Sequence, residues 1–469
     1  MKKVDDISEG FLNLEKKLNL FEYRFSNILI WDYIRYGIYL EIKKKTSKDT
    51  VAKTSLKSSL FKSIFLLLKS FFDFLINFSC YKVSLDKDII FLGHPRKVFE
   101  DSHYIDKYCN EIIEELHKEF SVKTLDLPFR LKHYKNEGVI DSKYLDVYEY
   151  LMIFAPYLVR TRLTEEEENF MEKIKSEIEK EFLVDINVSS HVKKGLKQYK
   201  ILQKRIDKLF VKNTPKCLIC VDGYDFIKKL FIEKANKHSI PTIELQHGAV
   251  GYFHIAYRYH KLENPLYSFP KCFFIWGEHW DKYLLLPEGK FSKVVGFPYL
   301  EKRVLAKKST EKNILVISQW TIGFELIKKV NELAEQLPEY NFLFKLHPNE
   351  IDEFGRYKSS IKAENISIVG NEIGLYDLFN KSIAQIGVYS TALIEGLAFN
   401  LPTFIVPING HNVFAEFINE RIMIKLTSFD DIVNELESKI SSTYTKNKVW
   451  HEEALANNIR EIKLIVQNH

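Results

Sequence analysis

FLFKLHPNE (residues 342–350) and IAQIGVYSTALIEGLAFNLPTFIV (residues 383–406) are the two segments that decide the predicted fold of this chain. Each begins with a short apolar run that predicts a buried strand, and each run stops at polar residues. The first stops at His347. The second stops at Tyr389, Ser390 and Thr391, where a helical pattern begins. We therefore predict an open α/β sheet with polar groups at the carboxyl ends of its strands.

These polar residues predict a site for a nucleotide phosphate. Ligands of open α/β sheets bind outside the carboxyl ends of the strands, where a helix N-terminus offers free N–H groups to an anion. Ser390 and Thr391 add hydroxyl donors, and His347 adds a ring nitrogen. Thr391 and Glu395 are four residues apart on one helix face, so the carboxylate can reach a ribose. Singly, these residues also fit a helix cap and a loop, so the prediction depends on their combination.

The segments KLHP and YSTALIEGLAFNLPT resemble the HP motif and the following Ser/Thr motif in the C-terminal domain of bacterial GT-B glycosyltransferases. The resemblance is to the group that holds the capsule sialyl- and polysialyltransferases, the Kdo-transferring capsule proteins and the CDP-glycerol glycerophosphotransferases. It covers about residues 215–410 and depends on the order and spacing of the motifs. In those families the histidine and the hydroxyls bind the phosphate of a CMP- or CDP-activated donor. The resemblance implies a GT-B fold, with two Rossmann-like domains facing a cleft.

A second group of polar residues follows two predicted strands nearer the N-terminus. Asp222 ends the strand CLICVD (217–222), and His247 lies at a glycine turn after the strand PTIELQ. The segment ELQHGAVG resembles the HG stretch of the same families, which implies that His247 is the general base. Transfer with inversion needs a base to take the proton of the acceptor hydroxyl, and imidazole titrates near neutral pH.

Two alternatives stay open at this second group. His247 can instead be held by a backbone carbonyl at a tight turn. Asp222 can instead be the base, because sialyl- and polysialyltransferases use an acidic residue in a paired-acid motif before glycine. This chain has Asp222-Gly223 without the paired acid.

The predicted donor site has further members. The segment NILVISQWT (313–321) predicts a strand that ends in Ser318 and Gln319 at the cleft, and Lys345 adds a positive charge. No metal is predicted, because no pair of acids lies at a convincing strand end and the helix end and side chains can neutralise the phosphate. Cys217 and Cys220 are three apart on a strand and point to opposite faces, which does not suit a shared metal. No cofactor is predicted.

Composition limits the function classes. The chain has 469 residues, enough for two or three domains, and a net charge of only +5 from 68 basic and 63 acidic residues. This balance does not indicate a nucleic-acid partner. Five scattered cysteines do not form a disulfide framework, and the opening MKKVDDISEG lacks the apolar core of a signal peptide. A cytoplasmic protein is therefore expected.

The segment LKSSLFKSIFLLLKSFFDFLINF (56–78) predicts an amphipathic helix with Lys62, Lys69, Asp73 and Asn77 near one face. Such a helix can lie in a membrane interface with its lysines toward anionic headgroups, on the inner face of the cytoplasmic membrane. The same pattern also fits a helix packed on its own protein.

The predicted domains follow from these motifs. They are a helical N-terminal extension (1–85), an N-terminal Rossmann-like acceptor domain (86–305), a C-terminal Rossmann-like donor domain (306–440) and a final helix that packs back on the first domain (441–469). Within the acceptor domain, residues 88–92 predict the first strand, His94-Pro95 a loop after it, and residues 100–216 mostly helices.

The leading functional prediction is a metal-independent glycosyltransferase that builds a bacterial capsule, lipopolysaccharide or teichoic-type glycan. Its partners would be a nucleotide-activated donor, a glycan or lipid-linked glycan acceptor and an anionic membrane surface. One alternative is a UDP-sugar 2-epimerase, which would act on the free nucleotide sugar without an acceptor. Another is a non-catalytic scaffold of polysaccharide export, which would bind nucleotide without turnover.

Overall fold

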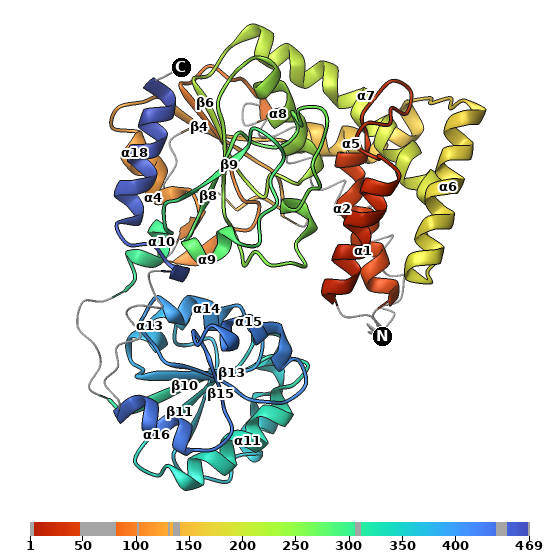
Figure 1. The fold of residues 1–469 in the computed structure, drawn as a ribbon. Helices are drawn as coiled ribbons and strands as arrows, with labels where there is room; N and C mark the ends of the chain where they lie inside the picture. Colours follow the sequence, from red (N-terminus) through yellow and green to blue (C-terminus); the bar gives the residue numbers. More distant parts are fainter. Residues whose placement is uncertain are drawn as a thin grey trace. The chain divides into compact units, whose positions relative to one another are not determined.

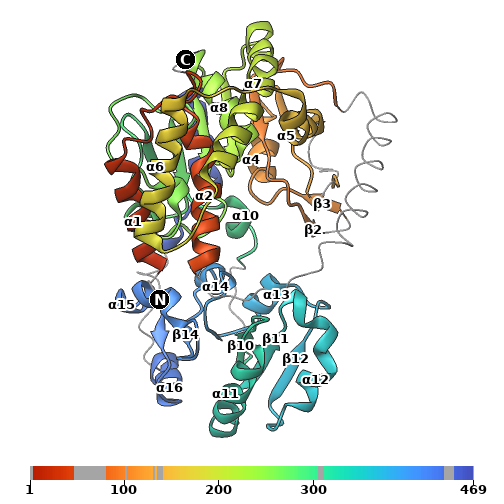
Figure 2. The same ribbon diagram turned by 90° about the vertical axis from the view of Figure 1, so that its right-hand side faces the viewer.

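The computed structural model describes residues 4–46, 81–100, 103–129, 132–134, 141–304, 311–437 and 448–467. The chain divides into two compact units, each with its own parallel sheet (Figures 1 and 2). Unit 1 holds Met1–Ile275, Trp280–Val295 and Leu455–His469, and unit 2 holds Trp276–His279 and Gly296–Ala454. The amphipathic helix predicted at 56–78 lies outside the described residues.

Seven parallel strands form the sheet of unit 1, in the order β5-β4-β1-β6-β7-β8-β9. Its central strands are continuous apolar runs because helices cover both faces of the sheet. The strands are β1 (Ile89–Leu92), β4 (Val122–Asp126), β5 (Ser142–Tyr144), β6 (Cys217–Val221), β7 (Thr242–Leu245), β8 (Cys272–Ile275) and β9 (Phe291–Val294). A separate antiparallel hairpin joins β2 (Val98–Glu100) to β3 (His103–Ile105).

Helices α4 (Asn110–Leu116) and α18 (Ala454–Gln467) pack on one face of this sheet (Figure 1). Their Ile112, Ile113, Ile459 and Ile462 join one buried cluster with the strands. Helix α8 (Phe226–Lys237) begins at Asp225, whose carboxylate accepts from the backbone N–H groups of residues 227 and 228. The remaining long helices of unit 1 are α1 (Val4–Lys17), α2 (Trp31–Thr46), α5 (Asp146–Leu158), α6 (Glu165–Phe182) and α7 (Val188–Lys212).

The N-terminal helices are tied to the rest of unit 1 by buried charges. The Arg35 guanidinium of α2 donates to both carboxylate oxygens of Glu15 at 2.7 Å and to the backbone carbonyl of Ile255 at 2.7 Å. Lys229 of α8 donates to the Asp32 carboxylate at 2.5 Å. Buried ion pairs of this kind fix α1 and α2 in place, because breaking one leaves an uncompensated charge.

The prediction that residues 100–216 are mostly helical is wrong in part, because β3, β4 and β5 lie in this range. The strand β4 (VKTLD) contains Lys123, so its sequence is not an uninterrupted apolar run and does not predict a buried strand. Lys123 is 2% exposed, and its ammonium is paired with Asp86 and lies 3.5 Å from Asp141. A lysine can occupy a buried strand when carboxylates at the sheet edge compensate its charge.

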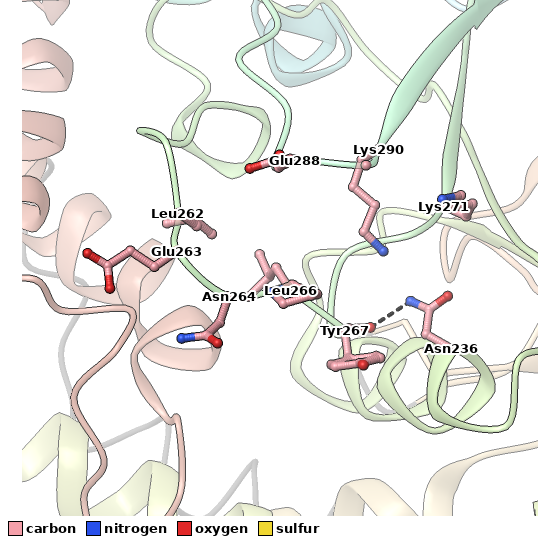
Figure 3. Close-up of a pocket in the computed structure, with 11 residues that line it drawn as sticks. Asn236, Leu262, Glu263, Asn264, Leu266, Tyr267, Lys271, Glu288 and Lys290 are labelled. Carbon is pink, nitrogen blue, oxygen red and sulfur yellow. Dashed lines mark hydrogen bonds between the residues drawn. The ribbon is translucent and has the colours of Figure 1, made fainter.

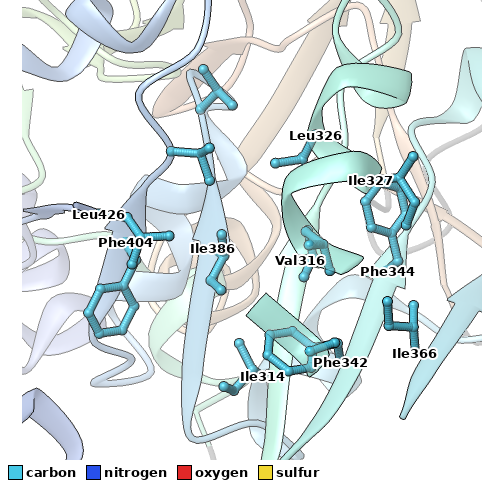
Figure 4. Packing of buried hydrophobic residues seen from close by; sticks show 14 of the residues in the cluster. Ile314, Val316, Leu326, Ile327, Phe342, Phe344, Ile366, Ile386, Phe404 and Leu426 are labelled. Atoms are coloured by element: carbon cyan, nitrogen blue, oxygen red, sulfur yellow. The ribbon is translucent and has the colours of Figure 1, made fainter. Parts of the chain in front are cut away.

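Six parallel strands form the sheet of unit 2, in the order β12-β11-β10-β13-β14-β15. One face packs on a helix through a cluster of aliphatic and aromatic side chains (Figure 4). The strands are β10 (Asn313–Ile317), β11 (Asn341–Lys345), β12 (Ile366–Val369), β13 (Ala384–Gly387), β14 (Thr403–Ile405) and β15 (Ile424–Lys425). The helices include α11 (Gly323–Gln336), α12 (Phe354–Ser359), α13 (Leu375–Asn380), α14 (Ala392–Leu397), α15 (Ala415–Asn419) and α16 (Asp430–Glu437).

Strand β13 shows how the two faces of this sheet are divided. Ala384 and Ile386 belong to the cluster that includes Leu326 and Ile327 of α11. Gln385 points to the other face, where its amide donates to the backbone carbonyl of Leu393 in α14 at 2.7 Å. This alternation follows from the period of two along a strand.

The predicted fold class, an α/β protein of the GT-B type with two Rossmann-like domains, is confirmed by the two parallel sheets. The residue boundaries of the predicted domains stay predictions. In the ranges that the structure covers, no helix combines the length and the apolar character that crossing a membrane requires.

Candidate functional site

In the sheet of unit 1, the order in which the chain adds strands reverses between β1 and β6. β1 pairs with β4 on one side and with β6 on the other, so the chain first builds outward through β4 and β5 and then returns. Ligands of open α/β sheets bind at such a switch point, outside the carboxyl ends of the strands. His94 follows β1, Asp222 follows β6 and His247 follows β7, so the structure brings both predicted catalytic residues to this edge.

Asp222 ends β6 with a left-handed backbone, φ 51°. Its carboxylate is paired with the buried ammonium of Lys228, which also donates to the carbonyls of Gly93 at 2.7 Å and Val221 at 2.8 Å. Burial raises the pKa of Asp222 to about 7, against the attraction of Lys228 and with help from the nearby carboxylate charges of Asp225 and Glu244. A carboxyl group with a pKa near neutrality can exchange a proton at physiological pH.

His247 is held from two sides by tyrosines. The Tyr224 hydroxyl lies 3.1 Å from Nε2, and the Tyr108 hydroxyl donates to the His247 carbonyl at 2.7 Å. Nδ1 is enclosed and has no hydrogen-bond partner among the described residues. Burial lowers the pKa of His247 well below its ordinary value, and neighbouring positive charges act in the same direction. The ring is therefore uncharged at neutral pH, as a proton acceptor must be.

The sequence analysis placed His94 only in a loop, whereas the structure brings it beside His247, with ring centroids 5.8 Å apart. The His94 backbone N–H donates to Asp106 at 2.7 Å, and burial lowers the pKa of the ring to about 4. His254 packs against Tyr224, with ring centroids 5.5 Å apart, and burial also lowers its pKa to about 4. Three histidine rings, each with a lowered pKa, thus lie in one chain of contacts, His94 against His247 and both His247 and His254 against Tyr224.

Glu244 was missed entirely by the sequence analysis. It is 1% exposed in the middle of β7, and its Oε1 accepts from the Gly223 backbone N–H and from the Tyr257 hydroxyl, both at 2.8 Å. Burial raises the pKa of this carboxyl to about 7. The signal in the sequence is the acid inside the otherwise apolar run TIEL, which needs partners if it is buried.

In unit 2 the strand order reverses between β10 and β13, because β10 pairs with β11 on one side and with β13 on the other. This sheet therefore has a switch point too, between β10 and β13. The residues after these two strands meet there, because the hydroxyls of Thr321 and Tyr389 share a hydrogen bond. Gln319 follows β10, and its amide oxygen is enclosed without a hydrogen-bond partner in the described part of the chain. Gln319, Ser390 and Thr391 therefore lie at the loops that flank the switch point of this sheet.

His347 begins the loop after β11, next to the switch point. Its Nδ1 accepts from the Asn349 backbone N–H at 3.2 Å, so the proton of the neutral ring is on Nε2. The loop is held by the buried Glu350, whose carboxylate accepts from the His347 backbone N–H at 2.7 Å and from the Tyr357 hydroxyl at 2.5 Å. This arrangement fixes the ring and leaves an Nε2–H donor on a half-buried side chain.

Ser390 and Thr391 precede α14, which has only six residues. The Ser390 hydroxyl accepts from the Ala392 backbone N–H at 3.4 Å, and Thr391 is exposed. Glu395, one turn on, accepts from the Tyr376 hydroxyl at 2.6 Å. Because so short a helix has a small dipole, the hydroxyl groups rather than the helix end would have to hold an anion.

Two predicted donor-site residues are engaged in supporting the loops. The Ser318 hydroxyl is buried and donates to Glu350 at 3.0 Å. The Lys345 ammonium donates to the backbone carbonyls of Gly370 and Ile373, the latter at 3.1 Å. In this arrangement Ser318 fixes the His347 loop, and Lys345 fixes residues 370–373.

A pocket of about 530 Å³ opens in unit 1 at the other edge of the sheet (Figure 3). Lys271 and Lys290 in its wall directly precede β8 and β9, so it lies at the amino ends of the strands. Lys290 donates to the Phe269 carbonyl at 2.8 Å, and burial lowers its pKa to about 8. None of the predicted site residues lines this pocket. Within the described ranges, no three His, Cys, Asp or Glu side chains come together as metal ligands would.

No family model matches the chain, and no curated protein sequence is similar to it. Solved structures are similar in fold. The UDP-GlcNAc 2-epimerase of Methanocaldococcus jannaschii matches with 12% identity and a TM-score of 0.48, over 81% of this chain and 99% of the other. The UDP-GlcNAc 2-epimerase of Neisseria meningitidis matches with 12% identity and a TM-score of 0.44, over 81% and 99%. The glycosyltransferase SnogD of Streptomyces nogalater matches with 11% identity and a TM-score of 0.40, over 80% and 99%.

Proposed function

We propose that this chain is a metal-independent glycosyltransferase that moves a sugar or polyol phosphate from a CMP- or CDP-linked donor to a bacterial capsule, lipopolysaccharide or teichoic-type glycan. The observation that carries the proposal is that each of the two sheets has its polar residues at its own switch point. Unit 1 gathers ionisable groups there, and unit 2 gathers uncharged donors. This division suits a transferase, which needs proton transfer at the acceptor and phosphate binding at the donor.

In the proposed donor site, His347 Nε2–H and the hydroxyls of Ser390 and Thr391 bind the phosphate. Gln319 contacts the nucleotide from the loop after β10, and Glu395 lies toward the ribose. Ser318 and Lys345 act through the loops that they hold. Uncharged donors on a fixed loop can bind an anion through several hydrogen bonds, each strengthened by the charge of the phosphate.

In the proposed acceptor site, His247 takes the proton of the acceptor hydroxyl. The neutral ring would accept the proton at Nε2, where the acceptor hydroxyl takes the place of the Tyr224 hydroxyl, because Nδ1 is enclosed. Asp222 is the alternative base, since its pKa of about 7 leaves it partly ionised at neutral pH. The buried ammonium of Lys228 stays charged, because the attraction of Asp222 and Asp225 outweighs burial and raises its pKa.

The experiment that tests this function follows nucleotide release from a panel of CMP-, CDP-, UDP- and GDP-linked donors, with and without glycan acceptors. The proposal expects release of CMP or CDP that depends on the acceptor. Conversion of a free UDP-sugar without acceptor would instead identify a 2-epimerase. Binding of nucleotide with no turnover of any donor would identify a scaffold.

An anionic membrane is part of the proposal as a further partner, supported only by the sequence of residues 56–78. Replacing Lys62 and Lys69 by glutamate should move the protein from vesicles of anionic lipid to the supernatant, because each lysine near such a surface contributes about 1 kcal/mol. Equal sedimentation of the native and the substituted protein would contradict this partner.

A further inference from the structure

The buried Glu244 of β7 is fixed against the turn that carries Asp222. Its Oε1 accepts two hydrogen bonds at 2.8 Å, from the Gly223 backbone N–H and from the Tyr257 hydroxyl. The first of these donors belongs to the residue directly after Asp222. A carboxylate with two such donors cannot move without leaving one of them unpaired, which costs about 1 to 3 kcal/mol for a buried group.

Gly223 leaves the space that the Glu244 carboxylate occupies. A Cβ atom at position 223 would lie 2.6 Å from Glu244 Oε2 and 3.0 Å from its Cδ. Only glycine therefore lets the turn after β6 approach the acid of β7 so closely. The Asp222-Gly223 pair and Glu244 form one arrangement, although 20 residues of sequence separate Glu244 from the turn.

The carboxyl groups of Asp222 and Glu244 are both buried, and the positive charge of Lys228 acts on both. Burial raises the pKa of each to about 7, and the negative charge of Glu244 adds to the rise at Asp222. Lys228 neutralises Asp222 directly, and Tyr257 donates to Glu244. The other ionisable groups that face the pair are Cys220 of β6, Tyr224 and Asp225 after it, and Lys229 of α8, which is itself paired with Asp32 of α2.

We propose that Glu244 is a positioning residue for Asp222: it holds the turn that carries Asp222 through the Gly223 backbone N–H, and it sets a second negative charge beside that turn at the edge of the sheet where the proposed acceptor site lies. Glu244 thereby supplies, from the neighbouring strand, the second acid that the Asp222-Gly223 sequence lacks. A like charge near a carboxylate raises its proton affinity, which lets Asp222 exchange a proton near neutral pH. This inference rests on the proposed function for its catalytic meaning, but not for its test.

The decisive variant is Glu244→Gln. The glutamine amide oxygen can still accept from Gly223 and Tyr257, so the turn keeps its hydrogen bonds while the negative charge is lost. The titration of Asp222 is followed by ¹³C NMR of protein labelled at its aspartate carboxyls, with Asp222→Asn to assign the signal. We expect the titration midpoint of Asp222 to fall by about one pH unit, because a like charge has been removed. The acid limb of the kcat profile should fall with it.

The matched control is Glu233→Gln, since Glu233 is another buried glutamate with two tyrosine donors, Tyr33 and Tyr199, but does not face Asp222. Should Glu244→Gln fail to fold, Tyr257→Phe provides a second route. Loss of its hydroxyl raises the proton affinity of Glu244, so Glu244 carries less negative charge and the Asp222 midpoint falls. An unchanged midpoint in a folded variant, or the same change in the control, overturns the proposal. Because NMR needs no turnover, failure of the proposed glycosyl transfer would appear separately, as absence of nucleotide release.

Discussion

The Tyr224 hydroxyl lies 3.1 Å from Nε2 of His247, and the centroid of the His94 ring lies 5.8 Å from the centroid of the same imidazole. The three side chains come from loops after three neighbouring strands of one sheet, β6, β7 and β1. Their convergence follows from the parallel topology, which brings the carboxyl ends of all strands to one edge. We predict that this convergence serves proton transfer.

His247→Asn should lower kcat by about 10²- to 10⁴-fold, the usual contribution of a general base, and leave the affinity for the donor unchanged. Steady-state kinetics with the identified donor checks this, and the loss should appear in kcat rather than in KM for the donor. His117→Asn, an exposed histidine at the end of α4, is the control. Turnover close to native in His247→Asn would make Asp222 the base.

His347→Ala should weaken nucleotide binding by about ten- to a hundredfold, because it removes one charge-assisted hydrogen bond worth roughly 1.5 to 3 kcal/mol. Titration calorimetry measures the affinity directly. Ser359→Ala removes an exposed hydroxyl from α12 of the same unit and should bind as the native protein does. The phosphate site would have to lie elsewhere if His347→Ala bound every nucleotide normally.

Gly223→Ala should destabilise the protein by about 1 to 3 kcal/mol, the usual cost of overpacking. The added methyl would lie 2.6 Å from the Glu244 carboxylate, which two hydrogen bonds hold in place. Gly248→Ala is the matched control, because no atom lies within 4 Å of a Cβ at that position. Denaturant unfolding that gives equal stabilities for the two variants would contradict the packing described for Glu244.

Arg35→Met should cost about 3 to 5 kcal/mol of unfolding free energy, because it leaves the Glu15 carboxylate buried without its partner. Lys17→Met is the comparison, since Lys17 pairs with Glu177 at the surface and its side chain is 64% exposed. A surface pair contributes about 0 to 1 kcal/mol. Equal effects in denaturant unfolding would mean that this ion pair does not hold α1 to α2.

Acid should destabilise the native protein more than a His254→Phe variant. Burial lowers the pKa of His254 to about 4, whereas an unfolded histidine titrates at about 6.5. As the pH falls below about 6.5, His254 binds a proton in the unfolded state but not in the native state, so the free energy of unfolding decreases. At about pH 5 this difference amounts to about 2 kcal/mol. Unfolding curves at about pH 7.5 and pH 5 measure it, and equal losses in both proteins would contradict the burial of the ring.

Much of the fold could be predicted from the sequence because its central strands are uninterrupted apolar runs. CLICV, FLFK and AQIG all lie where the pattern put them. β4 could not be found in this way, because Lys123 interrupts the run and its compensating carboxylates Asp86 and Asp141 come from other segments. Long-range ion pairs leave no periodic signal in one sequence.

The sequence could predict which strand each site residue follows, but not the hydrogen-bond partners of its side chain. Asp222, His247, His347, Ser390 and Thr391 all follow the strands that the sequence indicated. That Ser318 and Lys345 support loops depends on Glu350 and on the backbone of residues 370–373, which no spacing rule connects to them. The role of Glu244 could not be predicted either, because its partners, a backbone N–H and a tyrosine hydroxyl, come from other segments of the chain.

In the proposed function, the switch point of unit 2 binds the phosphate of a nucleotide. Thermal unfolding of the native protein with CMP, CDP, UDP and GDP tests it most directly, because a ligand at 100 times its dissociation constant stabilises the folded state by about 2.7 kcal/mol. We predict that CMP or CDP raises the melting temperature, and that the variant with both Ser390→Ala and Thr391→Ala loses most of this rise. No rise with any of the four nucleotides, or an equal rise in the variant, would contradict the account.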